Sequence, residues 1–270
     1  MKAVSKTIIA CSIAAASMFG VAAQAQAQDN FNPFTVEYDG RVFSADKITG
    51  NYNEVATFDA ENGTFNVSLV WNAGQFVTNG GTTPVTRTGL NNDYGLYALY
   101  TASGTFGIED GRNVFRFEEG SGRLAMYLDV NLDSTFALTD GATPATVGNV
   151  GDDRLLAEGN PLSGVGVLDP TLPTCGPDGI NCGSFGASSD FALAGFGPSF
   201  FTSPNPFYNL SFQSGQLNIF EPVGTQEING SLDVVFSNTA EVPEPASVGL
   251  LGLGMLGLYA ARRRNGKKAA

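Results

Sequence analysis

The chain has 270 residues, among them 14 basic and 26 acidic side chains, 3 cysteines and no histidine. The absence of histidine excludes Ser-His-Asp and Cys-His catalysis and metal binding through imidazole. From position 29 to position 241 there are 25 acidic residues and only seven basic ones, and this balance argues against nucleic-acid binding. A hydrophobic content of 43%, with 20 phenylalanines, is enough to form a packed core.

The first 27 residues are typical of a secretory signal peptide. Two lysines form a charged start, an apolar stretch covers 8–23, and Ala25 and Ala27 follow it in the small-x-small pattern of a cleavage site. Cleavage is predicted after Ala27, so that the mature chain begins at Gln28, with the two preceding alanines as alternative sites. The mature chain is therefore expected to keep two of the three cysteines.

The body of the chain, residues 28–241, carries short stretches in which apolar and polar residues alternate. In the clearest of them, Phe65, Val67, Leu69 and Trp71 occupy one face of a predicted strand. Further strands are predicted over 94–106, 114–117, 123–128, 207–220 and 227–236. No stretch of the body shows a sustained helical period with a cap at both ends.

These strands define the predicted fold class. The segments 114–117 and 123–128 flank a turn-rich connection and are expected to form a hairpin. Strands about 8–12 residues apart, separated by glycine and proline, predict a single all-β domain, an antiparallel β-sandwich or a jelly-roll-like domain. The Gly/Pro-rich segment from about 160 to 205 is predicted to be an insertion in it.

A candidate calcium site follows the predicted strand 123–128. Asp129, Asn131 and Asp133 stand at positions 1, 3 and 5, and Asp140 stands at position 12, where calcium loops place oxygen ligands. Ser134 replaces the usual glycine, and a strand rather than a helix precedes the loop, so an EF-hand is not expected. The alternative is a turn held by Asp and Asn side chains. No other cofactor is predicted.

No catalytic residue is predicted. Adjacent acidic pairs occur at 109–110, 118–119 and 152–153, but neighbours on a strand point to opposite faces. They do not by themselves form the two carboxyl groups that glycoside hydrolysis needs across a cleft. Aromatic residues at alternate strand positions form the core or, alternatively, stack on sugar rings; these are Trp71, Tyr97, Tyr100, Phe115, Phe117, Tyr127, Phe207 and Tyr208.

The two cysteines of the body, Cys175 and Cys182, bracket a turn-forming Gly-Pro-Asp-Gly sequence. In an exported chain this arrangement predicts a disulfide. A redox-active pair or a metal–thiolate site is the alternative, but it is disfavoured because the spacing is not Cys-x-x-Cys and no histidine is present.

The tail, 242–268, has three parts in a fixed order. A Val-Pro-Glu-Pro sequence comes first, the apolar segment 246–261 is predicted to be a short transmembrane helix, and three arginines follow; the residues are Val242, Pro243, Glu244, Pro245, Arg262, Arg263 and Arg264. Sixteen apolar residues are short for the roughly 30 Å hydrocarbon core of a bilayer, and the arginines are expected to stay in the cytoplasm.

This order resembles the PEP-CTERM sorting signal. The resemblance implies processing by exosortase, a transient stay in the inner membrane, and export to the cell surface or the extracellular matrix in bacteria that make exopolysaccharide. The segments 95–100, 206–217 and 229–236 are similar to the flocculation-associated PEP-CTERM family. This second resemblance implies a non-enzymatic protein that holds cells together in an exopolysaccharide floc or biofilm, with the polysaccharide as partner. The alternative is a secreted carbohydrate-active enzyme or lectin with the same signal.

Overall fold

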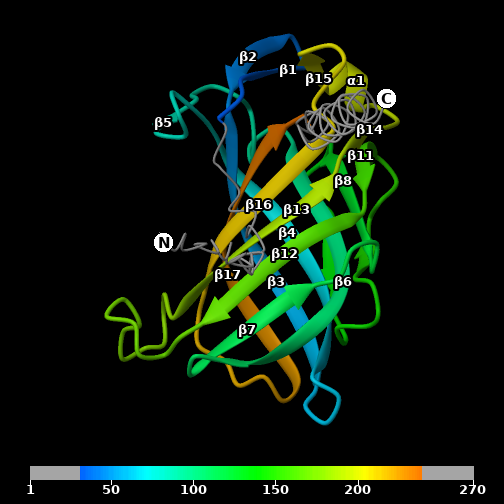
Figure 1. The fold of residues 1–270 in the computed structure, drawn as a ribbon. Helices are drawn as coiled ribbons and strands as arrows, with labels where there is room; N and C mark the ends of the chain where they lie inside the picture. The colour runs from blue at the N-terminus through cyan, green and yellow to red at the C-terminus, as the bar shows by residue number, and fades with distance from the viewer. Residues whose placement is uncertain (1–30, 239–270) are drawn as a thin grey trace, which may run out of the picture.

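The fold is taken from a computed structural model in which residues 31–238 are described (Figure 1). Nearly all of the regular structure in this part is β. In chain order the elements are β1 (Phe34–Tyr38), β2 (Arg41–Ala45), β3 (Lys47–Asp59), β4 (Thr64–Thr78), β5 (Thr83–Pro84), β6 (Gly95–Glu109), β7 (Arg112–Phe117), β8 (Arg123–Asp129), β9 (Thr135–Ala137), β10 (Thr146–Gly148), β11 (Arg154–Gly159), β12 (Pro161–Leu168), β13 (Gly183–Asp190), β14 (Ala192–Leu193), α1 (Gly197–Phe200), β15 (Phe201–Ser203), β16 (Leu210–Leu217) and β17 (Gly224–Ser237).

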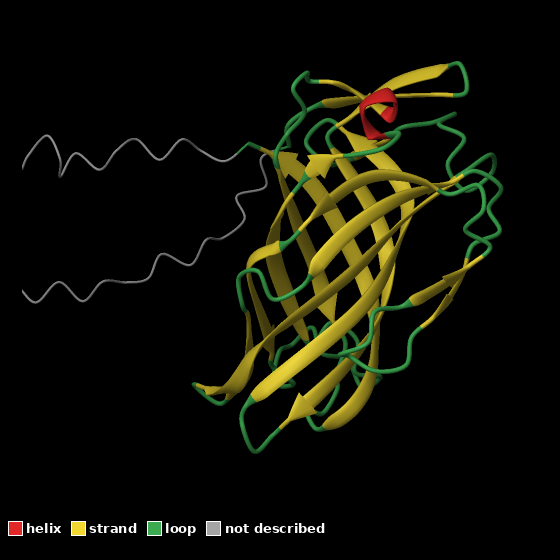
Figure 2. Cartoon of the chain, turned by 90° about the vertical axis from the view of Figure 1, so that its right-hand side faces the viewer, coloured by secondary structure: helices red, strands yellow, loops and turns green. Residues whose placement is uncertain are grey.

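The long strands close into an eight-stranded antiparallel barrel (Figure 2). The barrel strands pair with their neighbours along the chain, in the order β3, β4, β6, β7, β12, β13, β16 and β17. The first and last of these pair with each other, from Gly224 opposite Phe58 to Val234 opposite Ile48, and this pairing closes the barrel. The all-β prediction is therefore confirmed.

The prediction of a β-sandwich or jelly-roll-like domain is wrong in its architecture. A sandwich has two sheets with open edges, whereas each of the eight barrel strands is bonded along both edges. The strand β6, with 15 residues, bonds to β4 along one edge and to both β7 and β8 along the other. The sheet therefore curls back onto itself. Four of its strands have 13 to 15 residues, long enough to run the full height of the barrel.

The predicted hairpin of 114–117 and 123–128 is also wrong. The strands β7 and β8 do not pair with each other; they follow one another along the same edge of β6, with Phe117 opposite Gly104 and Arg123 opposite Thr101. A side chain at Gly104 would overlap the carbonyl oxygen of Arg116, and one at Gly122 would overlap that of Thr101. The turn-rich connection is therefore a bulge within one long strand path and does not reverse the chain.

The predicted insertion at 160–205 contains the barrel strands β12 and β13. Glycines in these and neighbouring strands make the sequence resemble a loop, but aromatic rings cover them. The Phe117 ring lies over Gly164, the Phe115 ring over Gly166, and the Phe185 ring over Gly215. Rings from adjacent positions thus supply the packing that the glycines lack.

One end of the barrel is covered by the three-stranded sheet of β15, β1 and β2 together with α1 (Figures 1 and 2). Phe34 of β1 contacts the rings of Phe201, Phe207 and Phe236 edge-on, at centroid distances of 5.9, 6.4 and 5.3 Å. Toward the opposite end, Phe58 lies 5.8 Å from the stacked ring of Phe220. The core is therefore the barrel interior, bounded by two aromatic clusters.

A separate two-stranded sheet, β9 and β10, packs on the outside of the barrel. The Phe136 ring of β9 meets Tyr97 of β6 edge-on at 4.9 Å, and the Gly141 N–H donates to Thr57 Oγ1 at 3.0 Å. Within residues 31–238, no helix has the length and apolarity needed to span a bilayer.

Candidate functional site

Three carboxylates meet where β8 ends. Asp129 is the last residue of β8, Asp133 lies in the following turn, and Asp152 comes from the loop that leads into β11. One oxygen of each lies within 4.8 Å of the others. Asp129 is only 6% exposed, whereas Asp133 lies at the surface.

Backbone hydrogen bonds hold this group in place. The Asp129 carboxylate accepts the N–H groups of Asp133 at 3.3 Å and Ser134 at 3.0 Å, which closes the turn. The Asn131 N–H donates to Asp152 at 2.8 Å, so the two loops are joined. The peptide backbone therefore positions two of the three carboxylates, those of Asp129 and Asp152.

Asp153 lies beside this group and has a structural role. Its carboxylate accepts the hydroxyl of Tyr97 at 2.5 Å and that of Ser134 at 3.1 Å. Burial raises the pKa of Asp153; the hydrogen bonds from Tyr97 and Ser134 oppose that shift, and the charges of Asp129 and Asp152 add to it. These contacts fix the loop before β11 to the outer face of the barrel.

The structure brings together two of the four residues predicted as calcium ligands, Asp129 and Asp133. Asn131 contributes its backbone N–H to the cluster, as described above. Asp140 belongs to another turn, where its carboxylate accepts the N–H groups of Ala142 and Thr143 at 2.9 and 2.7 Å. Hydrogen bonds from Thr143, through its N–H and its hydroxyl, lower the pKa of Asp140.

The sequence pattern did not identify Asp152 as a third carboxylate. The available signal was the Asp152–Asp153 pair immediately before a strand. Carboxylate oxygens are the ligands that Ca²⁺ prefers, so Asp129, Asp133 and Asp152 replace the predicted four as the candidate cation site.

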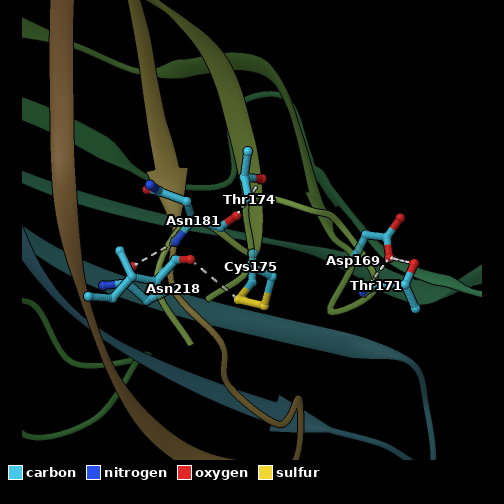
Figure 3. The surroundings of a disulfide bond; sticks show 8 residues. Asp169, Thr171, Thr174, Cys175, Asn181 and Asn218 are labelled. Carbon is cyan, nitrogen blue, oxygen red and sulfur yellow. Dashed lines mark hydrogen bonds between the residues drawn. A yellow bond between two sulfur atoms is a disulfide. The ribbon is translucent and has the colours of Figure 1, made fainter. Parts of the chain in front are cut away.

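The predicted disulfide between Cys175 and Cys182 is confirmed (Figure 3). It closes the loop between β12 and β13, and Cys182 is completely buried in the core. Around it, Thr174 Oγ1 donates to the Asn181 carbonyl at 3.0 Å, and the Cys182 N–H donates to the Leu217 carbonyl at 2.8 Å. The loop is thus attached to the end of β16.

The barrel interior contains a cavity of about 80 Å³ lined almost entirely by apolar side chains. The exceptions include Glu54, Tyr100, Ser211 and Gln213. Gln213 donates to Ser211 Oγ at 2.7 Å, whereas the buried Tyr100 hydroxyl has no hydrogen-bond partner in the described part of the chain. Burial raises the pKa of Glu54 to about 8.

Most of the aromatic residues singled out in the sequence belong to the core. Trp71, Tyr100, Phe115 and Phe117 line the cavity, and Trp71 Nε1 donates to the Leu232 carbonyl at 3.0 Å. Tyr97 and Tyr127 stack on each other outside the barrel, with centroids 5.1 Å apart. Phe207 belongs to the cluster around Phe34, and Tyr208 donates its hydroxyl to the Pro33 carbonyl at 2.9 Å.

The described part of the chain is thus a closed β-barrel with one disulfide. The predicted leader with its cleavage site, and the motif from Val242 to Arg264, lie outside the described residues. Residues 241–264 match the family described as the PEP-CTERM protein-sorting motif. The protein therefore carries the signal of exported proteins that exosortase processes and that are sorted to the cell surface. Neither the curated proteins nor the solved structures include a match to the chain.

Proposed function

We propose that the mature protein acts without catalysis at the cell surface or in the extracellular matrix, where it promotes exopolysaccharide-dependent cell aggregation. The observation that carries this proposal is the PEP-CTERM sorting motif at 241–264, which is carried by exported proteins that are sorted to the cell surface. The similarity of body segments to the flocculation-associated family supports the narrower role in flocculation and biofilm formation.

The geometry of the acidic residues supports a non-enzymatic role. The Asp129 carboxylate accepts backbone N–H groups, and Asp153 accepts the hydroxyls of Tyr97 and Ser134. Carboxylates engaged in this way stabilise loops and are poorly suited to exchange protons with a substrate. The aromatic side chains support the same conclusion, because most of them fill the barrel and are not exposed to stack on the sugar rings of a substrate.

Deletion of the gene tests the proposal when flocculation and total exopolysaccharide are scored separately. The expected result is dispersed cells that still make polysaccharide, with flocculation restored by the full chain and not by a chain that ends at Glu241. A loss of the polysaccharide itself, or normal flocculation without the protein, would overturn it. Polysaccharide cleavage by the purified secreted protein would support the enzyme alternative.

A further inference from the structure

An uncharged groove lies on the outside of the barrel, over β3, β17 and the end of β16. Alternate residues of these strands point outward, and many of them are carboxamides. Asn53 is directly opposite Asn229, and Asn51 is opposite Ser231. Neighbouring strands lie about 4.8 Å apart, so these side chains form one continuous polar surface.

The disulfide loop forms one wall of this groove. Its residues Ile180 and Asn181 stand beside Asn218, whose Oδ1 accepts the Asn181 N–H at 3.4 Å (Figure 3). Asn218 Nδ2 donates to the Asn229 carbonyl at 3.0 Å, which connects the wall to the strands. The groove has a volume of about 450 Å³, within the usual range of roughly 300–1,000 Å³ for ligand sites.

The groove is neutral although the protein is strongly acidic. Among the described residues that line it, none is charged. The nearest acids along β17 are Glu227 and Asp233, and Asp233 is paired with Lys47, whose Nζ lies 3.0 Å away. A patch of uncharged hydrogen-bonding groups favours an uncharged ligand, because a cation would be drawn to the carboxylates elsewhere and an anion would be repelled.

The amides available in the groove can both donate and accept hydrogen bonds. Asn51, Asn53 and Gln216 are exposed, and their side chains make no hydrogen bond within the described part of the chain. Each carboxamide offers two N–H donors and one oxygen acceptor. Sugar hydroxyls likewise donate and accept, and Ile180, which is 52% exposed, offers an apolar contact for the C–H face of a ring.

Other kinds of ligand fit this surface less well. An extended peptide would bind to a free strand edge, but β16, β17 and β3 are each paired on both sides. A nucleic acid would be repelled by the acidic body of the protein.

We propose that this groove, from Asn51 and Asn53 to Asn229 and the disulfide loop, binds an uncharged segment of a polysaccharide. The inference rests on the proposed function for one point, namely that the ligand is a polysaccharide of the cell's own matrix. It adds the class of ligand and the residues that recognise it.

Calorimetry with the mature protein purified from culture tests the proposal. The probe is matrix polysaccharide cut into oligosaccharides and separated by charge into neutral and acidic fractions. We expect binding to the neutral fraction, weakened about 10- to 30-fold in Asn51→Ala/Asn53→Ala, since each lost hydrogen bond contributes about 1 kcal/mol. Gln75→Ala, at an exposed carboxamide of β4 outside the groove, is the matched control and should bind like the wild type.

A second variant, Cys175→Ala/Cys182→Ala, releases the wall while the barrel strands keep their pairing, and it should also weaken binding. No binding of the neutral fraction, or equal binding by all variants, would contradict the proposal that this groove binds the polysaccharide. Those results leave the proposed function standing if deletion still disperses the cells. Conversely, groove-dependent binding together with normal flocculation in the deletion strain would support the site and contradict the proposed function.

Discussion

Glu54 of β3 and Tyr100 of β6 are both directly opposite Leu69 of β4. Directly opposite residues lie on the same face of a sheet, so the side chains of Glu54 and Tyr100 both face the interior cavity. The Tyr100 hydroxyl is buried without a hydrogen-bond partner in the described part of the chain. Burial, followed by the nearby Glu54 charge, raises the pKa of Tyr100. A charged carboxylate in so apolar a space is costly, and this cost raises the pKa of Glu54 to about 8.

This burial predicts a pH-dependent stability. Folded Glu54 keeps its proton up to about pH 8, whereas in the unfolded chain the carboxyl ionises near its usual value of 4.5. The unfolded state therefore binds fewer protons between these values, and the free energy of unfolding should fall by about 1.4 kcal/mol per pH unit as the pH rises. Urea unfolding at several pH values measures this slope. Glu54→Gln should flatten it, and an equally steep slope in that variant would contradict the assignment.

The junction between β7 and β8 predicts different effects for two glycines of the same strand. Gly104→Ala places a methyl group against the Arg116 carbonyl, whereas Gly107→Ala meets nothing within 4 Å. We expect Gly104→Ala to lower the free energy of unfolding by about 1–3 kcal/mol or more, because the backbone must move. Gly107→Ala should change it by less than about 0.5 kcal/mol. Equal losses in chemical denaturation would show that β7 does not meet β6 as described.

The acidic cluster predicts which residues would respond to calcium. We expect millimolar calcium to raise the melting temperature of the purified protein over its value in chelator, since a ligand that binds only the folded state stabilises it. Asp133→Asn and Asp152→Asn should abolish the increase. Asp140→Asn serves as the control, because this carboxylate belongs to a different turn, and it should retain the full calcium effect. A calcium response that depends on Asp140 would contradict the cluster.

The sorting motif predicts the ends of the mature chain. Mass spectrometry of extracellular material should find chains that begin near Gln28 and end near Pro245, because we expect the predicted signal peptide and the apolar tail to be removed during export. Chains in the matrix that still contain the arginines at 262–264 would show that the tail is retained as an anchor.

The fold class and the inward-facing residues could be predicted from the sequence. The alternation of Phe65, Val67, Leu69 and Trp71 places all four side chains in the barrel interior, as the strand period requires. The disulfide was predictable too, because Cys175 and Cys182 are close in the chain. These features depend on local spacing alone.

Closure of the barrel and the composition of the acidic cluster depend on contacts between distant residues. The strand pattern alone does not reveal that Gly224 pairs with Phe58, or that β7 and β8 share one edge of β6. Asp152 reaches Asp129 because β11 pairs with β8, and this register is set by the tertiary fold. The amide groove is likewise assembled from strands far apart in the chain.

The pairing of β17 with β3 has a consequence for the order of events during export. A chain that crosses the membrane from its N-terminus can form its other barrel pairs in sequence, since these link neighbouring strands. Until β17 emerges, β3 and β16 each keep an unbonded edge that can capture another chain. The last strand ends at Ser237 and the sorting motif begins at 241, so the motif reaches the export machinery only after the final strand has passed. Recognition of the motif thereby coincides with delivery of the last barrel strand, and chains cut short before β17 would be left with unpaired strand edges that can bind other chains.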